Sequence, residues 1–96
     1  MNWLVILWNW TDQGIRNAKG SPQWYETFKK DLEKAGRKLV GGYYTMSKYD
    51  GVIILEAPND EVVMKIMLAT ASLGNIRTRT LKAFLHTEGN KIMESL

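Results

Sequence analysis

The sequence contains no cysteine, and its 96 residues include only two prolines and one histidine. Without cysteine the chain can form neither a disulfide framework nor a thiolate nucleophile, and a cytoplasmic location is the default expectation. The one histidine, His86, has no second histidine or any cysteine to share a metal ion, so we expect no metal site and no other cofactor. A glycine-rich phosphate loop, a metalloprotease signature and a recognisable catalytic triad are also missing.

Long runs of one charge are missing as well. The 13 Lys+Arg and 10 Asp+Glu give a formal charge of +3, which favours nucleic acid only weakly. RNA-recognition domains carry stacking aromatic residues in a central strand, where this chain has the aliphatic residues 52–55. Nucleic-acid binding is therefore not expected. Residues 1–8 are apolar but too short to span a membrane and lack a basic flank, so we interpret them as part of a strand.

Apolar periodicity predicts a single domain over residues 1–96. We predict strands at residues 3–10, 38–46, 51–57 and 76–85, with a bulge near Gly41 and Gly42. A first helix should begin at Ser21-Pro22 and end at Gly36, and a second should run from Asn59 or Asp60 to Gly74. Residues 87–96 are expected to form a short helix or a docking tail.

The predicted order of elements is βαββαβ. Two right-handed crossovers place both helices on one face of an antiparallel sheet, which is the α+β ferredoxin-like plait with strand order 4-1-3-2. The sheet should then have one open face.

Both faces of this sheet are predicted to be apolar. Trp3, Val5 and Leu7 point to one side of the first strand, and Leu4, Ile6, Trp8 and Trp10 point to the other. Exposed side chains of this size would each forgo about 1.5–3 kcal/mol of burial energy, so a partner should cover the open face. We expect a homodimer or higher oligomer joined through the open faces. Coverage by the tail from Thr87 onward is the alternative.

Three polar segments should meet at one end of the sheet, because each lies at a strand boundary: residues 10–17, 43–51 and 73–78. They bring together side chains that could bind a small polar or aromatic ligand, with Trp10 and Tyr44 near the open face. The predicted ligand-binding residues are Trp10, Asp12, Arg16, Tyr44, Tyr49, Asp50 and Arg77. Asp50 and Tyr49 are the candidate catalytic groups. Alternatively, Asp12, Asn17 and Asp50 only satisfy loop backbone, with Arg77 in a salt bridge.

The chain resembles the GYD domain family in residues 10–17, Tyr44-Thr45-Met46, Tyr49-Asp50, residues 56–58 and residues 72–78. Of the glycine-tyrosine-aspartate signature, Tyr49-Asp50 matches, and Ser47-Lys48 stands where a glycine is usual. The resemblance implies a ferredoxin-like fold similar to the dimeric α/β-barrel proteins, which include small monooxygenases and isomerases. It implies no activity and carries over no catalytic residue.

These observations predict a small oligomeric protein that binds an aromatic or anionic molecule between two sheet faces. One alternative is a cofactor-free enzyme of the isomerase or monooxygenase type, which would require Asp50 or Tyr49 to point into a pocket. The other is an assembly module without a ligand.

Overall fold

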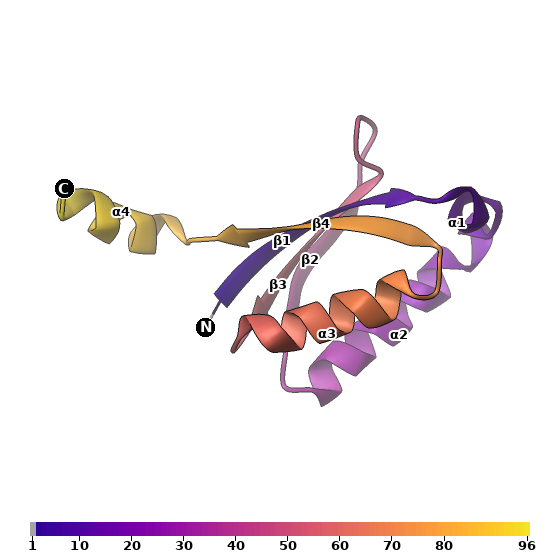
Figure 1. Ribbon diagram of the computed structural model, residues 1–96, viewed down its shortest axis with the longest axis horizontal. Helices are drawn as coiled ribbons and strands as arrows, with labels where there is room; N and C mark the ends of the chain where they lie inside the picture. The colour runs from indigo at the N-terminus through magenta and orange to yellow at the C-terminus, as the bar shows by residue number, and fades with distance from the viewer. Residues whose placement is uncertain (1) are drawn as a thin grey trace.

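Four strands form one antiparallel sheet in the computed structural model of the chain, which describes residues 2–96 (Figure 1). The strands are β1 (Asn2–Trp10), β2 (Lys38–Tyr44), β3 (Gly51–Ala57) and β4 (Ile76–Ala83). Their order across the sheet is β2-β3-β1-β4, which is the predicted order 4-1-3-2 counted from the opposite edge. The α+β plait is therefore confirmed.

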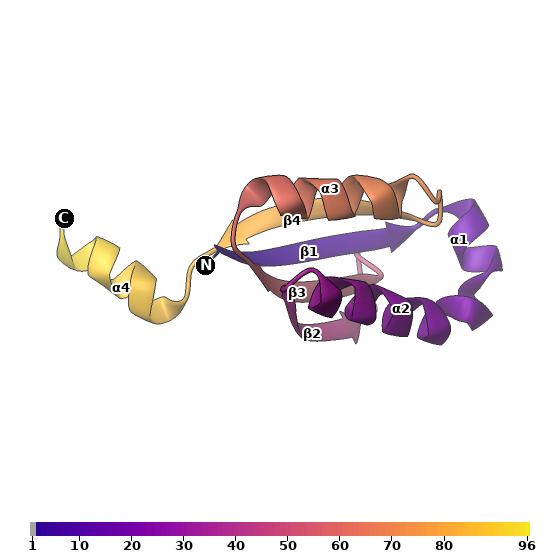
Figure 2. The ribbon, with the colours of Figure 1, turned by 90° about the horizontal axis from the view of Figure 1, so that it is seen from below.

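Two helices cover one face of this sheet and leave the other face open (Figure 1), and Figure 2 looks onto the helix-covered face. They are α2 (Ser21–Lys34) and α3 (Asp60–Ala71). The side chain of Asn59 caps α3 by accepting from the Val62 amide at 3.0 Å. Gly36 and Gly74 follow the helices with φ of 75° and 79°, as expected of glycines that end helices.

The core lies between α2, α3 and the sheet, and the alternation of β1 decides which side chains enter it. The buried core residues are Leu4, Ile6, Leu32, Leu55, Ala57, Val63 and Met67. Val5 and Leu7 alternate with the buried residues of β1 and are only half-buried, because no helix or strand within residues 2–96 covers the open face.

Two short elements were not predicted, and a third was predicted only as a short helix or a docking tail. A helix α1 (Asp12–Arg16) and a 3-10 turn η1 (Ala18–Gly20) connect β1 to α2. The terminal residues form a helix, α4 (His86–Glu94), which projects beyond the end of the sheet in both views (Figures 1 and 2). In this chain the tail therefore does not lie over the open face.

Two predicted strand ends were too long by two residues each. β2 ends at Tyr44 rather than at residue 46, and Met46 is 99% exposed in the loop that follows. β4 ends at Ala83 rather than at residue 85, because Leu85 begins the backbone that caps α4. A prediction from apolar composition alone makes the strand too long, because composition does not show which residues have a hydrogen-bonding neighbour in the sheet.

Candidate functional site

The three polar segments do meet at one end of the sheet. Register places Trp10 opposite Ile76, Trp8 opposite Gly51, and Tyr44 opposite Gly51 as well. The end of β1, the end of β2, the start of β3 and the start of β4 therefore share one edge, as the predicted topology requires.

The first segment is joined to the third by hydrogen bonds that close the loops. The Thr11 hydroxyl donates to the Gly74 carbonyl at 2.6 Å, and the Gln13 side chain donates to the Leu73 carbonyl at 3.0 Å. A Cβ added at Gly14 would lie 1.9 Å from the Asn75 carbonyl oxygen, so only glycine fits there. These contacts hold the first and third segments together.

Asp50 has a structural task in the same region. One carboxylate oxygen, Oδ2, accepts from the Trp10 amide at 2.8 Å and from the Asn9 side-chain amide at 3.4 Å. The carboxylate is thereby directed at the backbone of β1, and Asp50 does not line either of the cavities described below. The geometry favours the turn interpretation of Asp50 over its use as a general base.

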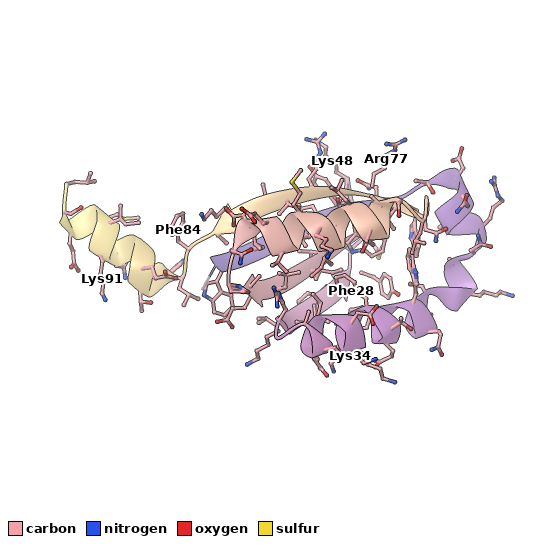
Figure 3. All side chains as sticks on the ribbon, turned by 60° about the horizontal axis from the view of Figure 1, so that its bottom comes forward. Phe28, Lys34, Lys48, Arg77, Phe84 and Lys91 are labelled. Carbon is pink, nitrogen blue, oxygen red and sulfur yellow. The ribbon has the colours of Figure 1, made fainter. Side chains whose placement is uncertain are left out.

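The remaining predicted side chains do not converge. Asp12 and Arg16 are exposed on α1, and Tyr49 is half-buried with the Lys48 ammonium 5.7 Å from its ring centre. Arg77 is exposed on the open face, and Figure 3 shows it and Lys48 directed away from the helices. Among residues 2–96 neither Arg77 nor Asp12 forms an ion pair, so the predicted salt bridge is not present.

Trp10 and Tyr44 lie on the helix-covered side, and their predicted position near the open face is wrong. The Trp10 ring stacks with that of Trp24 from α2 at a centroid distance of 6.5 Å and an interplanar angle of 9°. Tyr44 shares a 2.6 Å hydrogen bond between its phenol oxygen and Ser21 Oγ at the start of α2. The register shift between Leu39 and Gly41 explains why Tyr44 lies on the helix-covered side. One extra residue in a strand moves every later side chain to the opposite face.

A cavity of about 480 Å³ opens between α2, α3 and this end of the sheet. Its lining is mostly apolar and aromatic, with a small number of hydroxyl groups and, toward α2, the carboxyl-bearing residues Glu26 and Asp31. The lining includes Trp8, Trp10, Ser21, Trp24, Tyr44 and Ile53.

Four aromatic side chains form a continuous cluster along this cavity, which we call the aromatic cluster: Trp8, Trp10, Trp24 and Tyr44. Trp8 meets Trp10 edge to face at 4.9 Å and meets Tyr44 edge to face at 5.9 Å. Such geometries are those that ring quadrupoles favour, so the cluster holds its own shape. Trp8 needs Gly51 beside it, because a Cβ there would lie 2.2 Å from the indole ring.

Sequence reasoning missed Trp8, Ser21 and Trp24 as site residues. The sequence predicted Ser21-Pro22 only as the start of the first helix and placed Trp24 within that helix. In the structure Gly20 is the N-cap of α2, so no side chain caps the helix, and Ser21 is the first residue of the helix. The available signal was three tryptophans within 17 positions (8, 10 and 24) on elements predicted to pack together.

Among residues 2–96, no group of three or more histidine, cysteine, aspartate or glutamate side chains is arranged to hold a metal ion. His86 is exposed at the first position of α4. No helix within the described residues has the length and apolar character needed to cross a membrane.

Comparison with known proteins gives a family and a relative. The GYD domain family matches residues 4–93 of the chain. A protein of Thermus thermophilus, described as "Glutamine synthetase and cystathionine beta-lyase binding protein", is 31% identical over 80 residues, which cover 82% of this chain and 84% of that protein. No solved structure matches the chain.

Proposed function

This chain belongs to the GYD domain family, and from that premise we propose that it is a binding protein whose ligand site is the cavity beside the aromatic cluster. The single observation that carries this proposal is a cavity of about 480 Å³ with aromatic walls and a hydroxyl pair, Ser21 and Tyr44. A concave, mostly apolar space with a few convergent polar groups is the usual form of a small-molecule site.

The lining indicates the chemistry of the ligand. Indole and phenol rings favour a flat, apolar body, which can stack on them or meet them edge to face. The Ser21 and Tyr44 hydroxyl groups are hydrogen-bonded to each other, which leaves the pair one free donor and three acceptor lone pairs, so they favour a ligand with one oxygen-containing group. Glu26 and Asp31 along the same wall disfavour a strongly anionic ligand there. We therefore propose a neutral aromatic alcohol or phenol in preference to an aromatic carboxylate.

Nuclear magnetic resonance of the four tryptophan indole N–H signals tests this site. Benzyl alcohol is the neutral probe and benzoate is its anionic counterpart. We expect benzyl alcohol to shift the signals of Trp8, Trp10 and Trp24 in a saturable manner, while Trp3, on the open face, serves as the internal control. Equal shifts of all four signals, or no saturation up to millimolar probe, would reject the cavity as a ligand site.

A matched variant sharpens the same test. Tyr44→Phe keeps the ring and removes the hydroxyl that reaches Ser21. A neutral hydrogen bond contributes about 0.5–1.5 kcal/mol, so the affinity for benzyl alcohol should fall roughly three- to tenfold. An unchanged affinity would mean that the hydroxyl pair does not contact the probe.

We also propose that the chain associates as a homodimer through the open face of the sheet. That face carries the half-buried Val5, Leu7, Val52 and Ile54 and the 50%-exposed Leu81. A patch of this kind on a small protein is typical of an interface, and a second copy of the same patch is its simplest cover. Light scattering at micromolar concentration should give a mass near twice 11.0 kDa. A mass near 11.0 kDa would contradict the dimer.

A second candidate function is binding to a larger enzyme, which the description of the Thermus thermophilus relative favours. The exposed apolar surface is the feature of this chain that fits such a role. Sedimentation of the purified chain with purified glutamine synthetase tests it. Co-sedimentation that persists in the presence of benzyl alcohol would support a protein-binding function separate from the cavity, and independent sedimentation would count against it.

A further inference from the structure

A second cavity, of about 350 Å³, lies between α3 and β4 on the helix-covered side of the sheet. Figure 2 shows α3 running along β4 there. On β4 the first cavity, beside the aromatic cluster, is lined by Ile76 and Thr78, and the second is lined by Thr78, Thr80 and Lys82. These residues alternate along the strand and so point to the same face. The two cavities therefore follow each other along β4.

Two residues within the described part of the chain line both cavities, Met67 on α3 and Thr78 on β4. Met67 is 8% exposed, and Thr78 is half-buried. They belong to the two elements that enclose the second cavity, so their side chains stand where the two spaces adjoin. A methionine side chain is unbranched and has three rotatable bonds, so it adapts to a changed neighbour. The partition between the cavities is therefore movable at Met67.

We propose that the two cavities form one binding channel, and that its ligand is an aromatic alcohol that carries an unbranched alkyl chain. The proposal rests on the function proposed above, because it places the same ring and hydroxyl group in the first cavity. It adds the alkyl chain, which passes Met67 and lies in the second cavity. Met67 is then a specificity-determining residue, because it must move aside for an alkyl-substituted ligand but not for benzyl alcohol.

The register of the sheet gives the direction of this ligand. Successive partners in one row across the four strands are Tyr44, Gly51, Trp8 and Thr78. Tyr44 and Thr78 are three strand spacings apart, which is about 14 Å, and benzyl alcohol is shorter than this row. With the hydroxyl group of the ligand at Tyr44, its ring lies near Trp8. A para substituent then extends toward Thr78, where the second cavity begins.

The lining of the second cavity suits an uncharged alkyl chain. Leu4, Val63 and Ala71 give it apolar walls, and burial of methylene groups against such walls is favourable without any directed polar contact. At its outer end Lys82 Nζ and Asp60 Oδ2 form an ion pair at 3.7 Å. Because these two charges are paired with each other, this end of the cavity presents no single charge that would select an ionic group.

A series of benzyl alcohols tests the channel: the parent compound and its para-butyl and para-hexyl derivatives, titrated against the full chain by nuclear magnetic resonance. We expect the dissociation constant to fall about two- to fourfold for each methylene group that enters the second cavity. The methyl signals of Val63, which lines that cavity, should shift with the hexyl compound and not with benzyl alcohol. Val5, on the open face, is the matched control.

Two alanines of α3 supply matched variants. Ala71 lines the second cavity, whereas Ala69 lines neither cavity, and both are exposed, so leucine at either position is compatible with folding. Ala71→Leu should fill the second cavity and lower the ratio of hexyl to parent affinity by about tenfold. Ala69→Leu should leave this ratio unchanged. Met67→Ile, whose side chain is stiff at χ1, should lower the ratio as well.

The possible failures separate the channel from the function proposed above. If benzyl alcohol itself does not bind, both proposals fail together. If it binds but the longer alcohols bind no more tightly, the first cavity remains the site and the channel is rejected. If affinity rises with chain length but Ala71→Leu behaves like Ala69→Leu, or Val5 shifts together with Val63, the chain lies elsewhere and the channel is again rejected. An unchanged ratio in Met67→Ile would reject Met67 as the partition.

Discussion

The two faces of the sheet carry similar aliphatic side chains but lie in different surroundings. In β3, Leu55 faces the helices and is 1% exposed, while its neighbour Ile54 faces the open side and is only half-buried. Alternation along the strand decides which face a residue joins, but it does not decide whether that face is closed. The burial of each face therefore depends on what packs against it. The helices α2 and α3 bury one face, and we propose that a second copy buries the other.

The closed face is also the incompletely filled one. Ile53 lies on the same side as Leu55 and is packed against the core, but it also lines the large cavity and stays half-buried. A side chain that lines an open cavity has fewer neighbouring protein atoms than one within the core. The helix-covered face therefore combines a structural core at one end with a candidate binding site at the other.

Alanine substitution of adjacent residues in β3 should give the largest contrast between the two faces. Leu55→Ala should lower the free energy of unfolding by about 2–5 kcal/mol, because it leaves a cavity in the core. Ile54→Ala should cost less at low protein concentration, and its cost should grow as the concentration, and hence the dimer population, increases. Urea denaturation at two protein concentrations measures both. Equal, concentration-independent losses would show that the open face is not an interface.

A charge on the open face should separate the copies without unfolding them. Ile54→Lys forfeits about 1.5–3 kcal/mol of burial in each chain and places two ammonium groups near the interface. Met46→Lys adds the same charge in a loop, at a residue that is 99% exposed, and is the control. Light scattering should give the mass of one chain for Ile54→Lys and of two chains for Met46→Lys. A dimer that survives Ile54→Lys would place the interface elsewhere.

Gly51→Ala should damage the helix-covered face at the site itself. The added methyl group would lie 2.2 Å from the Trp8 ring, so the indole must move, at a cost of about 1–3 kcal/mol in unfolding free energy. Near-ultraviolet circular dichroism should report the displaced ring. Gly20→Ala is the control, since nothing lies within 4 Å of its added Cβ and its φ of −82° suits alanine. A Gly51→Ala protein with an unchanged spectrum and stability would contradict the packing of Trp8 against β3.

The sequence was sufficient to predict the plait and the meeting of the three polar segments, because strand order depends on periodicity and on the handedness of crossovers. It was not sufficient for the site. The bulge at Leu39 and Gly41 was foreseen, but whether it exchanges the face of Tyr44 depends on how many residues it adds, which composition does not reveal. Ser21 was predicted only as the start of the first helix, because its hydroxyl could bond either to the helix backbone or to a distant group such as Tyr44, and composition does not decide between them.

The smallest expected effect concerns two adjacent tyrosines that lie on opposite faces of β2. Tyr44→Phe removes the partner of the buried Ser21 hydroxyl and should cost about 0.5–1.5 kcal/mol of unfolding free energy. Tyr43 and Tyr44 are equally exposed, at 63% and 64%, but among the described residues the Tyr43 hydroxyl forms no hydrogen bond, so Tyr43→Phe should cost almost nothing. Because Ser21→Ala removes the other end of the same hydrogen bond, the Ser21→Ala/Tyr44→Phe double variant should lose less stability than the two single losses added together. Strict additivity, measured by urea denaturation, would mean that the two hydroxyls do not interact. Equal costs for the two tyrosine variants would mean that the hydrogen bond between Tyr44 and Ser21 contributes no net stability.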